Sequence, residues 1–158
     1  MRPQSRSKFE TAIICALPLE FDAVEALFDE HYDNTIYGKQ QGDENFYRTG
    51  RAGYHSIVLA CLPGIGKGSA ASVTSNLLVS FARVNLALVV GICGVLPYPS
   101  ANTELILGDI IINYSIVEYY FGRQYPDGFQ LNVRVRETLD RMNWRLRTFL
   151  SGLKTSRM

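Results

Sequence analysis

Uninterrupted apolar runs alternate along the first two thirds of the chain with segments of helical periodicity. Residues 11–17, 54–62 and 85–93 are apolar runs of the length expected for strands buried on both faces of a sheet. Residues 18–32 and 67–81 follow the first two runs, and their apolar or small residues recur at helical spacing. This alternation predicts an α/β domain with a mostly parallel sheet.

The remaining segments are shorter or less regular. Residues 46–49 suit a short strand, and residues 105–122 hold two β-branched or aromatic stretches around a Gly-Asp turn. Residues 132–154 have apolar positions at alternating steps of four and three, which predicts an amphipathic helix. In parallel sheets, ligands gather at the loops that follow the carboxyl ends of strands. The loops after Leu17, Leu62 and Gly91 are therefore candidate binding loops.

Composition narrows the class of protein. The chain has 158 residues, 47% of them hydrophobic and 20% charged, as in ordinary globular domains. A net charge of +1 argues against a dedicated nucleic-acid surface. An odd cysteine count of three without a C-x-x-C pair argues against disulfides or zinc. We expect no membrane segment, because the longest apolar run is short and broken by glycine, and we expect a cytoplasmic location, with the nucleus as an alternative.

The stretch "CLPGIGKGSAAS", residues 61–72, has the look of a phosphate-binding loop. A P-loop requires glycine four residues before Gly-Lys, where Cys61 stands, and serine or threonine directly after, where Gly68 stands. A dinucleotide fingerprint fails as well, because Gly68 comes one residue too early for its third glycine. Neither standard phosphate-binding motif is present.

Four motifs occur in a fixed order: "ICALPLE", "PGIGKGSAAS", "LALVVGICGVLP" and "LGDIII". In this order and spacing they resemble the purine and uridine phosphorylase superfamily, which includes phosphorolytic enzymes and methylthioadenosine/adenosylhomocysteine nucleosidases. The later stretch "VEYYFGRQYPDGF" is similar to the version of this domain found in fungal multidomain proteins. The resemblance implies a truncated three-layer α/β sandwich with a mixed, mostly parallel central sheet. It implies no cofactor and no metal.

The resemblance also implies a nucleoside site. Gly64, Ile65 and Gly66 match the loop over the sugar, where glycines allow close approach of backbone N–H groups. The remaining candidates that match substrate-binding positions are Gly91, Ile92, Gly94 and Phe121.

Glu20 distinguishes between the two branches of that superfamily. Its position holds a phosphate-binding arginine in the phosphorylases and a glutamate that activates water in the nucleosidases. A carboxylate repels phosphate but can act as a general base. Val89 replaces a second arginine, and Ile92 replaces a serine. The residues therefore favour hydrolysis of a purine nucleoside over phosphorolysis.

Structural roles are available for the same residues. Glu20 can be a first-turn acid that favours the helix dipole, and Gly91 and Gly94 can simply end a strand tightly. Phe121 and its aromatic neighbours can belong to a core. We assign Asp109 to a turn rather than to chemistry.

The family places its ribose-binding glutamate and its leaving-group aspartate well after the last of these motifs. We expect residues 1–10 to be disordered, residues 11–154 to form the partial domain, and residues 155–158 to be a tail. Whether such a chain is an enzyme is open, and we expect little or no turnover from it. The alternative is a catalytically inactive module for nucleoside sensing or protein interaction, and a flavodoxin-like domain without a ligand is a third interpretation. We expect a homo-oligomer, or contact with a missing C-terminal half, to cover the open edge of the sheet.

Overall fold

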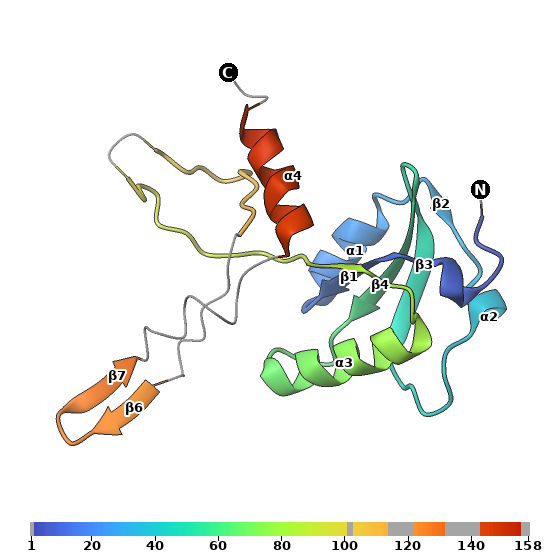
Figure 1. Cartoon of the computed structure of the whole chain (residues 1–158), viewed down its shortest axis with the longest axis horizontal. Helices are drawn as coiled ribbons and strands as arrows, with labels where there is room; N and C mark the ends of the chain where they lie inside the picture. Colours follow the sequence, from blue (N-terminus) through green and yellow to red (C-terminus); the bar gives the residue numbers. More distant parts are fainter. Residues whose placement is uncertain (1, 101–102, 114–121, 132–142, 156–158) are drawn as a thin grey trace. The chain divides into compact units, whose positions relative to one another are not determined.

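A computed structural model describes residues 2–100, 103–113, 122–131 and 143–155 of the chain (Figure 1). The chain divides into two compact units, Met1–Val95 and Leu96–Met158. The elements of unit 1 are η1 (Arg6–Lys8), β1 (Thr11–Cys15), α1 (Pro18–Glu25), β2 (Glu30–His31), α2 (Asn34–Tyr37), β3 (Phe46–Ala52), β4 (His55–Cys61), α3 (Lys67–Ser80) and β5 (Leu86–Val89). The elements of unit 2 are β6 (Gly122–Tyr125), β7 (Gly128–Leu131) and α4 (Trp144–Thr155).

Unit 1 is built on a five-stranded mixed sheet with the order β2-β3-β4-β1-β5. β1 lies in parallel between β4 and β5, whereas β2, β3 and β4 pair antiparallel. The parallel half is formed by the three apolar runs at the start of the chain, as the sequence predicts. The carboxyl ends of β4, β1 and β5 therefore lie on one side of the sheet. We call this side, which runs across the strand ends, the carboxyl edge.

The two faces of this sheet bury different sets of side chains. Ala12 and Ile14 of β1 point into a core with Val73 and Leu77 of α3. Ile13 and Cys15 point to the opposite face, into a cluster that α1 joins through Phe21 and Val24. This alternation is the period of two expected for a strand buried on both faces. The α1 and α3 helices thus cover opposite faces and complete the three-layer α/β arrangement (Figure 1).

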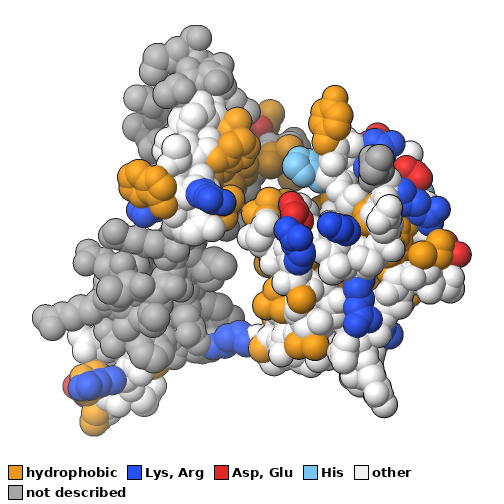
Figure 2. Space-filling model, turned by 45° about the vertical axis from the view of Figure 1, so that its right-hand side comes forward, with side chains coloured by type: hydrophobic (Ala, Val, Ile, Leu, Met, Phe, Trp, Pro, Cys, Tyr) orange, Lys and Arg blue, Asp and Glu red, His pale blue; other side chains and the backbone are white. Residues whose placement is uncertain are grey.

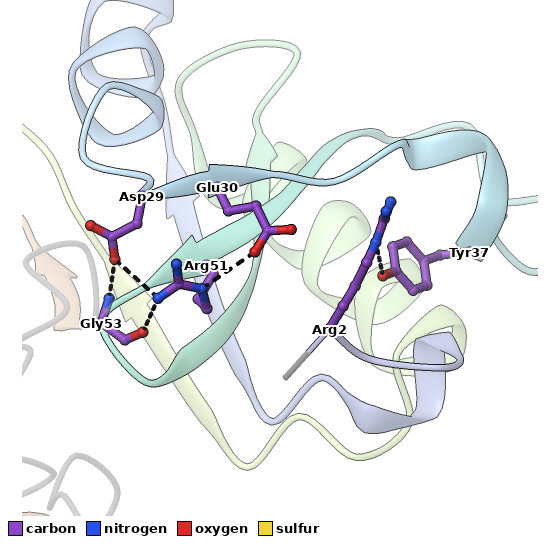
Figure 3. Close-up of polar contacts among 6 residues, drawn as sticks. All are labelled: Arg2, Asp29, Glu30, Tyr37, Arg51 and Gly53. Carbon is purple, nitrogen blue, oxygen red and sulfur yellow. Dashed lines mark hydrogen bonds and ion pairs between the residues drawn. The ribbon is translucent and has the colours of Figure 1, made fainter.

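The N-terminal residues, for which we expected disorder, are anchored to unit 1. Phe9 is fully buried and packs edge-to-face on Tyr37 and Phe81, with ring centroids 4.9 and 5.5 Å apart. Arg2 donates from Nε to the Tyr37 hydroxyl at 3.4 Å, as Figure 3 shows. Phe9 buries a large apolar surface, and this stabilises the segment although its other residues are mostly polar.

A buried polar network joins α3 to the loop before β3. The Asp43 carboxylate accepts hydrogen bonds from Tyr47 Oη at 2.9 Å and Ser80 Oγ at 2.5 Å. Asn45 Nδ2 in turn donates to Tyr47 Oη at 2.8 Å and to the Val73 carbonyl at 2.9 Å. Because buried polar groups are costly when unpaired, this network fixes the loop in one conformation.

Unit 2 contains a hairpin and a helix among its described residues. β6 and β7 pair antiparallel around Pro126-Asp127, and Gly128 after this turn has a φ of +146°. α4 confirms the C-terminal half of the helix expected over 132–154, and residues 132–142 lie outside the described part. Residues 105–107, before the Gly-Asp turn, form no strand. Gly108 has a φ of +104° there, and Asp109 Oδ2 accepts from Ile106 N at 2.9 Å.

Candidate functional site

The three candidate loops of the sequence leave the sheet at the same edge. The loop after β4 is bonded to the end of β1, because Leu62 N donates to the Cys15 carbonyl at 2.9 Å. On the other side of β1, Val90 N donates to the Ile14 carbonyl at 3.0 Å. The parallel order β4-β1-β5 therefore brings the loops after Cys15, Cys61 and Val89 side by side.

Glu20 connects two of these loops. It occupies the third position of α1, and its carboxylate folds back over the start of the helix. One carboxylate oxygen, Oε2, accepts from Ala16 N at 3.1 Å and from Leu17 N at 2.9 Å. The other, Oε1, accepts from Ile92 N at 2.8 Å. The side chain is 8% exposed, so it ties the loop after β1 to the loop after β5 from a buried position.

These N–H groups set the acidity of Glu20. The hydrogen bond from Ile92 N is the main cause that lowers its pKa, followed by those from Leu17 and Ala16, and burial acts in the opposite direction. Donors that favour the charged form outweigh desolvation here. Glu20 is therefore an ionised carboxylate at neutral pH. It can attract or orient a proton donor, but it is a weaker base than an ordinary glutamate.

We predict that Glu20 makes folding stability depend on pH in the acid range. A carboxyl group whose pKa is lower in the folded state stabilises the fold above its unfolded pKa, about 4.3 for glutamate. That contribution is lost as the pH falls through the folded-state value. Wild type should exceed Glu20→Gln in stability by about 1–2 kcal/mol at pH 7, and the difference should shrink between about pH 5 and pH 3.

Urea unfolding of both proteins at several pH values measures this difference. A constant difference between wild type and Glu20→Gln down to pH 3 would show that the three N–H bonds do not favour the ionised side chain in solution.

The glycine loop after β5 lies directly against Glu20. A Cβ added at Gly91 would be 2.8 Å from Glu20 Oε1, closer than a real Cβ approaches an oxygen, so only glycine leaves the carboxylate in place. Gly94 has open space around it. Ile92 contributes its backbone N–H to Glu20, while its side chain is 73% exposed. Val89 is also exposed. The two positions that would carry phosphate-binding groups thus present apolar side chains.

The loop of Gly64, Ile65 and Gly66 follows β4 and leads into α3. Gly66 precedes the first residue of the helix with a φ of +134°, a conformation that favours glycine. Ile65 is exposed, and a Cβ at Gly64 would meet no atom within 4 Å. The backbone of this loop is therefore accessible, as a loop that covers a ligand requires. Phe121, the remaining candidate, lies outside the described residues.

One contact at this edge is not apparent from sequence motifs. Cys15 and Cys61 are register partners on neighbouring strands, so they share one face of the sheet. Burial, with Glu20 adding to it, raises the pKa of Cys15 to about 11, which keeps this thiol protonated. The backbone donors Ala16 and Leu17 could have been anticipated, because a glutamate at the third helical position commonly bonds back to the cap.

Other surfaces of the described residues are weaker candidates for a functional site. A hollow of about 300 Å³ lies at the opposite, amino edge of the sheet, where Lys8, Glu10, Tyr54 and His55 contribute to its lining. Within the described residues, no three His, Cys, Asp or Glu side chains are placed to hold a metal ion. None of the helices described is long and apolar enough to cross a membrane. Figure 2 shows basic, acidic and hydrophobic side chains interspersed on the face in view.

Comparison with known proteins gives the same superfamily that the four sequence motifs resemble. The family model described as the phosphorylase superfamily matches residues 10–148. A nucleotide-binding leucine-rich repeat (NLR)-like protein of the fungus Hyaloscypha variabilis is 30% identical over 129 residues. That match covers 78% of this chain and 13% of the relative, so the chain spans a small part of the relative's length. No solved structure matches the chain.

Proposed function

Since the chain belongs to the phosphorylase superfamily, we propose that it binds a purine nucleoside over the carboxyl edge of β4, β1 and β5 and acts on the N-glycosidic bond by hydrolysis. The observation that supports this proposal is the contact of Glu20 with Gly91 and its hydrogen bond from Ile92 N. These contacts place an ionised carboxylate against a glycine loop at the carboxyl edge, where α/β sheets bind ligands.

The charges at this edge support hydrolysis rather than phosphorolysis. A phosphate dianion would lie near the ionised Glu20 and beside the apolar side chains of Val89 and Ile92. Water is neutral and can donate a hydrogen bond to the carboxylate. Glu20 then accepts a proton from water as the water oxygen bonds to the anomeric carbon, and the bond electrons leave with the base nitrogen.

We expect adenine release from adenosine or methylthioadenosine to be slow, independent of added phosphate, and reduced by at least tenfold in Glu20→Gln. The rate is low because hydrogen bonds lower the pKa of Glu20, and no acid is assigned to protonate the departing base. Chromatographic detection of adenine at long incubation times measures it. Release that requires phosphate would contradict hydrolysis, and release that Glu20→Gln leaves unchanged would contradict the role of Glu20.

A second candidate function is nucleoside sensing without cleavage. It is favoured by the fact that both oxygens of Glu20 already accept backbone hydrogen bonds, so the carboxylate serves as a structural tie. The NLR-like name of the fungal relative is compatible with a recognition module. Nucleoside binding with no adenine release from wild type would support this candidate over the first.

A further inference from the structure

The hollow of about 300 Å³ at the amino edge of unit 1 lies at the opposite ends of the strands from the proposed nucleoside site. Thr11 begins β1, Ser56 is the second residue of β4, and Asn85 precedes β5, so the starts of three parallel strands meet around it. Small-molecule sites in proteins occupy about 300–1,000 Å³. The hollow therefore has room for a small ligand.

The polar side chains that line the hollow are mostly groups that can donate hydrogen bonds. Lys8 contributes an ammonium group, His55 an imidazole and Asn85 a side-chain amide. Thr11 and Ser56 add one hydroxyl each. Within the part of the chain that the structure describes, no hydrogen bond or ion pair engages any of these five side chains. Their donors are therefore available to a ligand.

The acid that lines the hollow, Glu10, is already compensated by a base. Arg83 Nη2 lies 3.6 Å from Glu10 Oε1. The Glu10 carbonyl also accepts from Asn85 N at 3.0 Å and from Leu86 N at 3.2 Å, which fixes the start of β5 against β1. Because Arg83 and Glu10 cancel, the charge of Lys8 leaves the hollow with one positive charge in excess. This excess favours an anionic ligand.

The turn between β3 and β4 forms one wall of the hollow and is held from two sides (Figure 3). Asp29 Oδ2 accepts from Gly53 N at 2.6 Å, and Arg51 Nη1 donates to the Gly53 carbonyl at 2.7 Å. Tyr54 follows Gly53 in this turn and lines the hollow, yet its side chain is fully exposed. A fixed turn thus presents an aromatic ring on which a planar ligand can stack.

We propose that the amino edge binds a small aromatic molecule that carries a phosphoryl group. The phosphoryl oxygens accept hydrogen bonds from Lys8, Asn85 and the hydroxyls beside them, and the ring lies on Tyr54. A phosphoryl group has three acceptor oxygens, which suits this number of donors better than the two of a carboxylate. The site shares no residue with the carboxyl edge, so it does not depend on the proposed hydrolysis.

Titration of phenyl phosphate into the 158-residue chain, followed by amide chemical shifts, locates the ligand without any variant. We expect saturable shifts at Thr11, His55 and Ser56 and none at Gly91 or Ile92 of the carboxyl edge. Inorganic phosphate and phenol each carry one half of the ligand, and each should bind about tenfold more weakly or worse. The absence of saturable shifts at the amino edge, shifts at the carboxyl edge instead, or equally tight binding of inorganic phosphate would overturn the proposal.

Lys8→Glu in the same titration tests the charge. It replaces the ammonium group with a carboxylate that repels the phosphoryl group, and we expect the dissociation constant to rise by about tenfold or more. Lys39→Glu is the matched control, because it makes the same change of charge on an exposed lysine that does not line the hollow. Equal weakening by both variants, or no weakening by Lys8→Glu, would refute a phosphoryl site at this edge.

Discussion

Replacing Gly50 with alanine is expected to destabilise unit 1 by roughly 2 kcal/mol or more, the cost of forcing extra volume into a packed core. Gly50 lies on β3, where it pairs with His31 of β2 and Ile57 of β4. A Cβ at this position would overlap the ring of Phe28 and lie 2.7 Å from the Glu30 carbonyl oxygen. The ring is buried and the carbonyl is backbone, so neither can move without displacing β2.

Thermal unfolding followed by circular dichroism measures this effect, which for a unit of this size corresponds to a melting temperature lowered by roughly 8–16 °C. Gly68→Ala is the control, since a Cβ there meets no atom within 4 Å and alanine favours the α3 helix that contains it. Equal stability of Gly50→Ala and wild type would show that β2 does not pack over Gly50 as described.

The parallel half of the fold could be predicted from sequence because its signals are local. The runs that form β1, β4 and β5 are continuous and apolar, and Pro18 marks the start of α1. The β2 strand could not be predicted in this way. It is two residues long, and its pairing depends on Gly50 and Arg51, which are distant in sequence.

Two other features show where local patterns are insufficient. The polar composition of residues 1–10 indicated disorder, but the single aromatic Phe9 enters the core and fixes the segment. The run 105–112 is rich in β-branched residues, yet it forms no ladder, because strand formation requires a partner strand as well as propensity.

The candidate site was predictable in its position and less so in its chemistry. The motif order places Glu20 and Gly91 at one edge, and the structure brings them into contact. The sequence could not show that Ile92 contributes a backbone N–H rather than its side chain, because that depends on how the loop turns after β5. It is this bond that lowers the pKa of Glu20 most, and with it the strength of the proposed base.

We expect Gly91→Ala to weaken nucleoside binding by tenfold or more. The added Cβ would lie 2.8 Å from Glu20 Oε1 and 3.1 Å from Cδ, so the carboxylate must swing away from Ile92 N. The loop after β5 then loses its tie to the loop after β1. Gly68→Ala in α3 is the control, because its Cβ would meet no atom within 4 Å and leaves Glu20 undisturbed.

Calorimetric titration of methylthioadenosine into wild type, Gly91→Ala and Gly68→Ala is the most direct test of the claim that Glu20 organises a nucleoside site at this edge. We predict measurable binding to wild type, retained binding to Gly68→Ala, and at least tenfold weaker binding to Gly91→Ala when all three proteins are equally folded by circular dichroism. The absence of binding to wild type, or equal binding to Gly91→Ala and Gly68→Ala, would contradict it.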